Sequence, residues 1–223
     1  MRANYHTHCD YCDGQASTAA MAAAARGAGL DILGFSSHAP LGRSIYDGNM
    51  KLERLGAYVA EIRALAAEWE TRGLEVLLGL EVDWLRGAMA PRDELFAGLG
   101  LDFTIGSVHL VDLGQGPFAV DDARERFDAR LAQDAGGDAR LVWKAYYEEL
   151  SALIEAGGFD ILGHFDLVRK NNAGGRCFDE DDPAYLRAAF DAAGLLAGTG
   201  IVAEINYGAM SRSNAKSPYP SLA

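Results

Sequence analysis

Short apolar stretches alternate with helical patterns along the whole chain, and this alternation constrains the fold more than any other feature. The predicted strands are residues 3–8, 32–37, 75–82, 101–108, 159–163 and 201–206. The predicted helices are residues 17–29, 51–72, 91–99, 141–156 and 183–197. Strands and helices in alternation imply a parallel sheet that is covered by helices. Residues 112–138 follow no regular pattern, and we assign them no structure.

The helix predictions rest on apolar spacing and on capping residues. In residues 51–72 apolar side chains recur every three or four positions, as they do on one face of an amphipathic helix. Ser17 or Thr18 is the expected N-cap of the alanine-rich stretch that follows. Pro91 is expected at the first position of residues 91–99, because a helix tolerates proline there.

All five histidines lie at or near the ends of predicted strands. His6 and His8 are two positions apart on one strand, so their side chains should share a face, and Asp13 can add a carboxylate to them. The others, each directly after an apolar run, are His38, His109 and His164. Imidazole and carboxylate are usual ligands of zinc, iron and manganese. An isolated His-x-His can arise by chance, but five histidines at strand ends indicate a common metal site.

The position of these residues favours a barrel. Each candidate ligand lies at the C-terminal end of a predicted strand, which is where the active sites of (β/α) barrels lie. A doubly wound open sheet is the alternative, but it would spread the strand ends along a line. We therefore expect a single barrel domain over residues 1–223, a size that α/β barrels commonly reach.

Composition excludes some classes of function. The formal net charge of −12 argues against a general affinity for nucleic acid or for an anionic membrane, since both need a basic face. It leaves open a small phosphorylated substrate that metal ions and one or two arginines would hold. We expect neither a signal peptide nor a membrane span, because the N-terminus resembles a strand and the apolar runs are short.

Cysteine usage points to a reducing cytoplasm. The three cysteines, Cys9, Cys12 and Cys177, make no disulfide framework. The Cys9-x-x-Cys12 pair could belong to a redox or zinc-ribbon site. That interpretation is disfavoured, because there is no second cysteine pair and no helix start of the thioredoxin kind.

Five motifs in this order resemble the polymerase-and-histidinol-phosphatase (PHP) superfamily. They are His6-x-His8, Ser-Ser-His38, Gly-Leu-Glu81, Gly-Ser-Val-His109 and Gly-His164. The longer strings, such as Gly-His164-Phe-Asp-Leu-Val-Arg-Lys and Glu204-Ile-Asn206, look like its histidinol-phosphatase branch. The resemblance extends from Ala3 to about Tyr207, which is nearly the whole chain.

The resemblance implies a distorted, TIM-like (β/α)7 barrel with two or three divalent ions, zinc, manganese or iron, at its C-terminal face. The positions that match the family's metal ligands are His6, His8, Asp13, Glu81, His109 and His164. Glu81 is then the bridge between two ions, and Asp13 stands where the family often has histidine. His38 is expected to bind a third ion or the substrate. The family usually closes with an Asp-x-His pair that this sequence lacks, so we expect a C-terminally truncated chain without its last βα unit.

The activity that the resemblance implies is hydrolysis of L-histidinol phosphate to L-histidinol and phosphate, a step of histidine biosynthesis. The alternatives are another PHP-type phosphoesterase, acting on a nucleotide or other small phosphomonoester, and a metal-binding protein without catalysis. Two ions about 3.5–4 Å apart can activate water and neutralise phosphoryl charge. The candidate catalytic groups are Glu81, Asp83 and Asp166. The two aspartates could protonate the leaving alcohol or instead orient ligand imidazoles.

Arg43 and Arg169 are the candidates for binding the phosphate, because the guanidinium fork matches its oxygens. Pairing with the many carboxylates of the surface is the alternative for both. Asn206 lies at a strand end, where it could donate to the substrate or cap its own loop.

Overall fold

The computed structural model describes residues 1–41, 48–212 and 216–221. The chain divides into two compact units. Unit 1 comprises Met1–Asp83 and Pro91–Ile105, and unit 2 comprises Trp84–Ala90 and Gly106–Ala223. The single domain expected over residues 1–223 stays a prediction, and each unit is described by itself.

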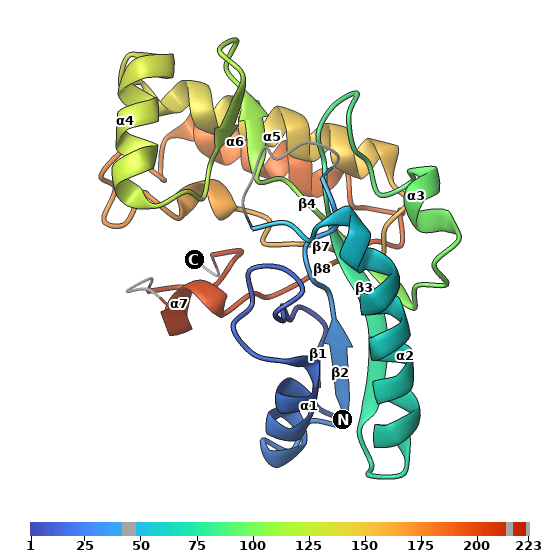
Figure 1. Ribbon diagram of the computed structural model, residues 1–223. Coiled ribbons are helices and arrows are strands. Elements are labelled where there is room, and N and C mark those ends of the chain that lie inside the picture. Colours follow the sequence, from blue (N-terminus) through green and yellow to red (C-terminus); the bar gives the residue numbers. More distant parts are fainter. Residues whose placement is uncertain (42–47, 213–215, 222–223) are drawn as a thin grey trace. The chain divides into compact units, whose positions relative to one another are not determined.

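Unit 1 is a parallel sheet with helices. Its strands are β1 (Ala3–Asn4), β2 (Ile32–Phe35), β3 (Glu75–Asp83) and the first residues of β4 (Phe103–Ser107). Its helices are α1 (Thr18–Gly27), the 3-10 helix η1 (Leu52–Arg54), α2 (Leu55–Glu70) and α3 (Glu94–Ala97). In the parallel register Ala3 lies opposite Ile32, and Phe35 lies opposite Leu78. Helix α2 lies along β3 (Figure 1).

Sequence and packing agree closely in α2. Its buried residues are Leu55, Tyr58, Ile62, Leu65 and Trp69. These positions are three or four apart, as the predicted amphipathic face requires. The Tyr58 hydroxyl donates to the carbonyl oxygen of Gly79 at 2.8 Å, so this face is tied to β3 by a buried hydrogen bond as well as by apolar contact.

Two glycines of the sheet are packing positions. A Cβ atom on Gly34 would lie 2.7 Å from the Phe103 ring, and one on Gly79 would lie 2.5 Å from it. Real Cβ atoms do not approach other atoms so closely, and the Phe103 side chain is buried. The ring therefore packs against β2 and β3 because both strands carry glycine at the point of contact.

Two predicted elements of unit 1 are shorter than the sequence pattern suggested. Strand β1 ends at Asn4, so His6 and His8 lie in the segment after it. Pro91 does not begin a helix, because it lies in a turn with Arg92, a position that its fixed φ suits equally well. Helix α3 begins only after Asp93. Ser17 caps α1 as predicted, accepting a hydrogen bond from the backbone N–H of Ala20.

Unit 2 consists of short strands and helices. Its strands are the end of β4, β5 (Leu110–Asp112), β6 (Pro117–Ala119), β7 (Ile161–Leu162) and β8 (Val202–Ala203). Its helices are α4 (Arg124–Ala135), α5 (Ala139–Ala156), the 3-10 helix η2 (Leu167–Arg169), α6 (Pro183–Gly194) and α7 (Gly208–Arg212). Helices α5 and α6 pack side by side (Figure 1), and Trp143, Tyr146 and Leu150 of α5 are buried in the core of the unit.

The region without a predicted structure is ordered. Strands β5 and β6 form an antiparallel hairpin, with Val111 opposite Phe118. Gly114 and Gly116 between them have φ values of 85° and 92°, which glycine adopts readily. Helix α4 follows and ends at Ala135, and the next residue, Gly136, adopts the left-handed conformation. Strands this short carry too little periodicity to be recognised in the sequence.

The order of the strands distinguishes the two predicted architectures. Hydrogen-bonded neighbours follow the order β1-β2-β3-β4-β7-β8, and β4 contributes its first residues to unit 1 and its last to unit 2. A doubly wound sheet reverses its order at a switch point, whereas this order follows the sequence, as in a barrel. The α/β class is thereby confirmed.

In the described part of the chain, no helix combines the length and apolar character needed to cross a bilayer.

Candidate metal centre

The backbone pairing of β2 and β3 continues into the centre of the site. Past the end of β2, His38 forms a parallel bridge with Glu81 of β3. The Glu81 N–H donates to the Ser37 carbonyl at 3.1 Å, and the Ala39 N–H donates to the Glu81 carbonyl at 2.8 Å. The two site residues are therefore placed by the sheet itself, and the Glu81 side chain is fully buried.

Three imidazoles converge on one oxygen of this carboxylate. Glu81 Oε2 lies 3.3 Å from His6 Nε2, 3.1 Å from His8 Nε2 and 3.1 Å from His38 Nδ1. His6 Nε2 and His8 Nε2 are themselves 3.1 Å apart, and their rings stack at 16°. The prediction that the His-x-His pair shares a face is confirmed, although both residues lie beyond the end of β1.

The arrangement fits a metal cation. Two N–H groups cannot face each other at 3.1 Å, so at least one of His6 and His8 directs a nitrogen lone pair into this space. A divalent ion accepts several such lone pairs together with a carboxylate. Burial opposes a charge on His8, yet its contacts with Asp13, Cys12 and Glu81 raise its pKa well above the usual value. The surroundings thus favour positive charge at this point.

Asp13 completes the ligand group of unit 1. Its Oδ1 lies 2.9 Å from His8 Nδ1, the ring nitrogen that faces away from Glu81. Burial raises the pKa of Asp13, but the hydrogen bond and charge of His8 outweigh it and hold the pKa well below its usual range. Ligand atoms of His6, His8 and Glu81 lie within 4.8 Å of one another, and so do those of His8, Asp13 and His38. All five predicted ligands of unit 1 come together.

The loop after His8 folds back tightly on itself. The Cys12 N–H donates to the Cys9 carbonyl at 3.1 Å, and the Asp10 N–H donates to the Ala16 carbonyl at 3.0 Å. A Cβ atom on Gly14 would lie 2.5 Å from backbone atoms of His8 and Cys9. Glycine at this position therefore allows Asp13 to reach back to the imidazole.

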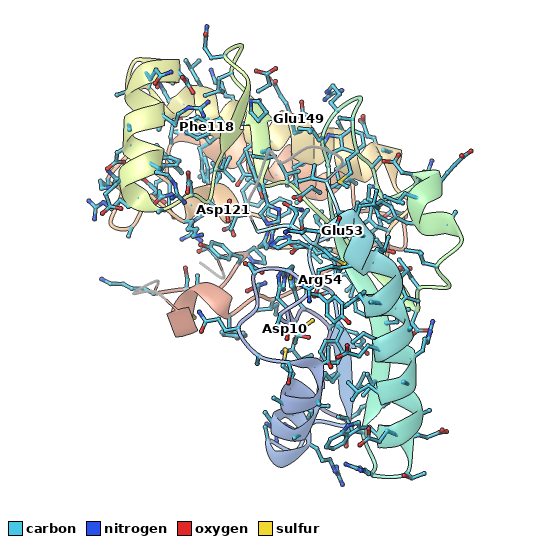
Figure 2. The ribbon with its side chains drawn as sticks, in the orientation of Figure 1. Asp10, Glu53, Arg54, Phe118, Asp121 and Glu149 are labelled. Atoms are coloured by element: carbon cyan, nitrogen blue, oxygen red, sulfur yellow. The ribbon has the colours of Figure 1, made fainter. Side chains whose placement is uncertain are left out.

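Charged residues from η1 and α2 hold this loop. Arg54 Nη1 donates to the carbonyl oxygens of Asp10, at 2.7 Å, and Tyr11, at 3.2 Å; Figure 2 labels Arg54 and Asp10. The Tyr11 hydroxyl donates to Glu61 at 2.6 Å, and the Thr18 hydroxyl donates to the same carboxylate. Sequence analysis missed Arg54 and Glu61, since no local pattern distinguishes them from the other charged residues of these helices.

Cys12 is a further residue at the site that sequence analysis did not assign. Its sulfur lies near both His8 and Asp13, and all three cysteines are free thiols. Burial raises the pKa of the Cys12 thiol, but the hydrogen bond and charge of His8 bring it below its usual value. The available signal was its position inside the first motif, directly before Asp13.

Asp83 is the last residue of β3 and is buried. Asn49 Nδ2 donates to Asp83 Oδ2 at 3.1 Å and to the Ala39 carbonyl at 2.8 Å, which ties the segment after His38 to the strand end. Arg43, predicted to bind phosphate, lies outside the described residues.

In unit 2, His109 and His164 lie together. Both are buried, and their ring centroids are 4.8 Å apart with a 65° angle between the planes. The Val120 N–H donates to the His109 carbonyl at 2.9 Å. The His164 N–H donates to Glu204 Oε1 at 2.8 Å, and Tyr146 donates to the His164 carbonyl at 3.2 Å. The backbone beside each imidazole is thus fixed by hydrogen bonds.

Asp166 and Arg169 form an ion pair beyond β7. Asp166 Oδ2 accepts from Arg169 Nη1 at 3.0 Å and from the Ser221 N–H at 2.9 Å. Burial raises the pKa of Asp166 in spite of the nearby guanidinium. Arg169 also donates to Glu180 at 2.7 Å and to Ser217 at 3.3 Å. To bind a phosphate, Arg169 would have to exchange one of these partners for it.

Asn206 makes the contacts of a loop cap. Its Oδ1 accepts from the Gly208 N–H at 2.8 Å, and its Nδ2 donates to Glu204 Oε1 at 2.9 Å. Glu204, which belongs to one of the quoted strings but was assigned no role, therefore joins Asn206 to the backbone of His164. A contact of Asn206 with substrate stays a prediction.

Comparison with known proteins agrees with the resemblance seen in the motifs. The family model of the PHP domain matches residues 4–207. A Deinococcus radiodurans protein named "Probable histidinol-phosphatase" is 34% identical over 204 residues, which cover 90% of this chain and 71% of that protein. The predicted membership of the superfamily and of its histidinol-phosphatase branch is confirmed.

The fold is also shared with a solved structure. A Listeria monocytogenes protein, assigned as the histidinol phosphatase hisK, aligns with a TM-score of 0.86 at 20% identity, over 98% of this chain and 87% of that one. The predicted fold class, a distorted TIM-like α/β barrel, is confirmed. The histidinol phosphate phosphatase of Lactococcus lactis, solved with zinc, L-histidinol and phosphate, aligns over 92% of this chain with a TM-score of only 0.41, which does not establish a shared fold.

Proposed function

Because the chain belongs to the PHP family, we propose that it is a metal-dependent phosphomonoesterase that hydrolyses L-histidinol phosphate to L-histidinol and phosphate. The 34% identity with the protein named a histidinol-phosphatase supports this substrate. The structural observation that carries the proposal is the convergence of three imidazole nitrogens on Glu81 Oε2, at 3.1–3.3 Å.

The proposal assigns two or three divalent ions, zinc, manganese or iron, to this protein. The residues proposed to bind them are His6, His8, Asp13, His38, Glu81, His109 and His164. When bound, such ions activate water and neutralise the charge of the phosphoryl group. The buried Glu81 carboxylate, whose Oε2 lies 3.1–3.3 Å from three imidazole nitrogens, would hold two of these ions.

Asp83 and Asp166 are proposed either as the proton donor to the leaving alcohol or as groups that orient neighbouring side chains. The two roles differ in their dependence on the leaving group. A p-nitrophenolate ion leaves without a proton, whereas an alkoxide needs one. If Asp83→Asn or Asp166→Asn removes the proton donor, turnover of histidinol phosphate falls far more than turnover of p-nitrophenyl phosphate. An equal loss on both substrates assigns an orienting role.

Arg43, Arg169, His38 and Asn206 are the residues proposed to bind the small phosphorylated substrate. A guanidinium that binds the phosphate also stabilises the charge of the phosphoryl group in the transition state. Replacing either arginine by lysine should therefore lower kcat/KM for histidinol phosphate. A substitution that lowers only the free energy of unfolding would assign Arg169 to its ion pairs with Asp166 and Glu180 alone.

Metal analysis of the purified chain, followed by comparison of histidinol phosphate with a nucleotide monophosphate, tests the proposal. We expect bound divalent metal and a kcat/KM for histidinol phosphate at least about 100-fold higher, a ratio that corresponds to about 2.7 kcal/mol. Preference for the nucleotide would assign another phosphoesterase activity. Bound metal without hydrolysis of any monoester would indicate a metal-binding protein, and a chain unable to bind metal would refute the proposal altogether.

A further inference from the structure

Cys12 has no part in the function proposed above, yet its sulfur belongs to a compact group of metal-ligating atoms. The Cys12 sulfur lies 3.6 Å from His8 Nδ1 and 3.5 Å from Asp13 Oδ1. His8 Nδ1 and Asp13 Oδ1 are 2.9 Å apart. A thiol, an imidazole nitrogen and a carboxylate oxygen therefore form a triangle within one short loop.

These spacings match those between ligands of a single tetrahedral zinc ion. Bond lengths of about 2.3 Å to sulfur and about 2.0–2.1 Å to nitrogen and oxygen place sulfur about 3.5–3.6 Å from each of the other two ligands, and nitrogen about 3.3 Å from oxygen. Both distances to the Cys12 sulfur already have these values. Only the hydrogen-bonded pair His8 Nδ1 and Asp13 Oδ1 would have to separate, by a few tenths of an ångström.

The surroundings of His8 Nε2 also suit an ion bound at His8 Nδ1. An imidazole that binds an ion through Nδ1 keeps its proton on Nε2. Glu81 Oε2 lies 3.1 Å from that nitrogen and can accept the proton in a hydrogen bond. Ligand histidines commonly donate their second N–H to a carboxylate, which fixes the tautomer and the ring orientation.

We propose that Cys12, with His8 and Asp13, binds one of the metal ions of this site through its thiolate. Binding forms the bond between sulfur and metal and releases the thiol proton to solvent. Thiolate ligands select zinc and similar ions over manganese and magnesium, which prefer oxygen. Cys12 would therefore make this position selective for zinc. The inference rests on the proposed metal site but needs no catalytic turnover for its test.

Cobalt(II) titration of the metal-free chain of residues 1–223 is the direct test, because a thiolate bound to cobalt gives a charge-transfer band in the near ultraviolet. The wild-type chain and the control variant Cys177→Ser, whose cysteine lies in unit 2, should both show the band. Cys12→Ser should lose it and bind zinc on the order of 10²-fold more weakly, with manganese affinity unchanged. Circular dichroism verifies that each variant is folded.

The outcomes separate this inference from the proposed function. Cobalt binding without a charge-transfer band in the wild-type chain, or a band that persists in Cys12→Ser, would overturn the role of Cys12 and leave the histidine site intact. A chain that binds no cobalt at all would overturn both. A second measurement, alkylation of the wild-type chain, needs no variant. Zinc should protect Cys12 from alkylation but leave Cys177 unprotected. Equal protection of both cysteines would also refute the assignment.

Discussion

Glu81 and His38 face each other twice, once through a parallel backbone bridge and once through Glu81 Oε2 and His38 Nδ1, which are 3.1 Å apart. The pairing of two strands thus delivers the carboxylate and the imidazole to the same point. The hydrogen bonds of the sheet hold these two residues in place, whereas His6, His8 and Asp13 lie in the segment after β1. The consequences can be tested one residue at a time.

Glu81→Gln should abolish metal binding with little change in fold. The amide keeps the size of the side chain but removes the charge that attracts the cation. We expect turnover to fall on the order of 10²-fold or more and bound metal to be lost. Metal analysis, steady-state kinetics and circular dichroism measure this. Glu68→Gln is the control, since Glu68 is exposed and pairs with Arg72. A Glu81→Gln chain with full metal content would contradict the site.

Gly14→Ala should weaken metal binding by opening the loop. The new Cβ would lie 2.5 Å from the backbone of His8 and Cys9, and backbone cannot yield as a flexible side chain does. We expect metal affinity to fall by about tenfold or more and the free energy of unfolding by about 1–3 kcal/mol, as in other overpacked sites. Isothermal titration and denaturant unfolding provide the two values.

Gly27→Ala is the matched control for this substitution. Gly27 is the last residue of α1, and a Cβ there would meet nothing within 4 Å. Alanine favours the helix by up to about 1 kcal/mol, so this variant should be as stable as the wild type or more so. If both glycine variants bound metal equally well, the close approach at Gly14 would have no functional importance.

Tyr11→Phe should loosen the same loop without touching a ligand. The lost hydrogen bond to Glu61, 2.6 Å long, joins the loop to α2. A hydrogen bond to a charged group contributes about 1.5–3 kcal/mol, so we expect a lower melting temperature and a several-fold weaker metal affinity. Tyr207→Phe, at an exposed position of unit 2, serves as control. An unchanged melting temperature and metal affinity for Tyr11→Phe would show that the hydrogen bond to Glu61 is dispensable.

Asp122 should make stability depend on pH. Its hydrogen bond with Arg126, 2.7 Å long, lowers the pKa of the carboxyl group below its usual value. Because the pKa is lower in the folded state, the stabilisation is present above the unfolded-state pKa of about 3.9 and is lost as the pH falls through the folded-state pKa.

Asp122→Asn should accordingly lower the free energy of unfolding by less than about 1 kcal/mol at pH 7, because the Arg126 side chain is exposed and solvent screens the pair, and the difference should shrink in strong acid. Denaturant unfolding at several pH values measures it. Asp191→Asn, at an exposed position of α6, is the control. A difference that stayed constant from pH 7 to acid would assign the effect to packing rather than to charge.

Much of the fold could be predicted because it rests on local patterns. The apolar spacing of α2 and the Ser17 cap of α1 both agree with the structure. The helix start predicted at Pro91 was wrong, since proline suits a turn as well as a helix start, and the helix begins at Glu94. The β5–β6 hairpin was missed because strands of three residues are too short to show a period.

The amino-acid sequence by itself determined the kind of site. Histidines and Glu81 at strand ends can be recognised without coordinates, because a parallel sheet brings its carboxyl ends to one edge. Only the tertiary structure decided what surrounds them. Glu61 reaches Tyr11 across 50 positions of the chain, and the Cys12 sulfur approaches His8 because the loop folds back at Gly14. Contacts between residues this distant, or produced by one tight turn, leave no periodicity in the sequence and arise only when the chain packs.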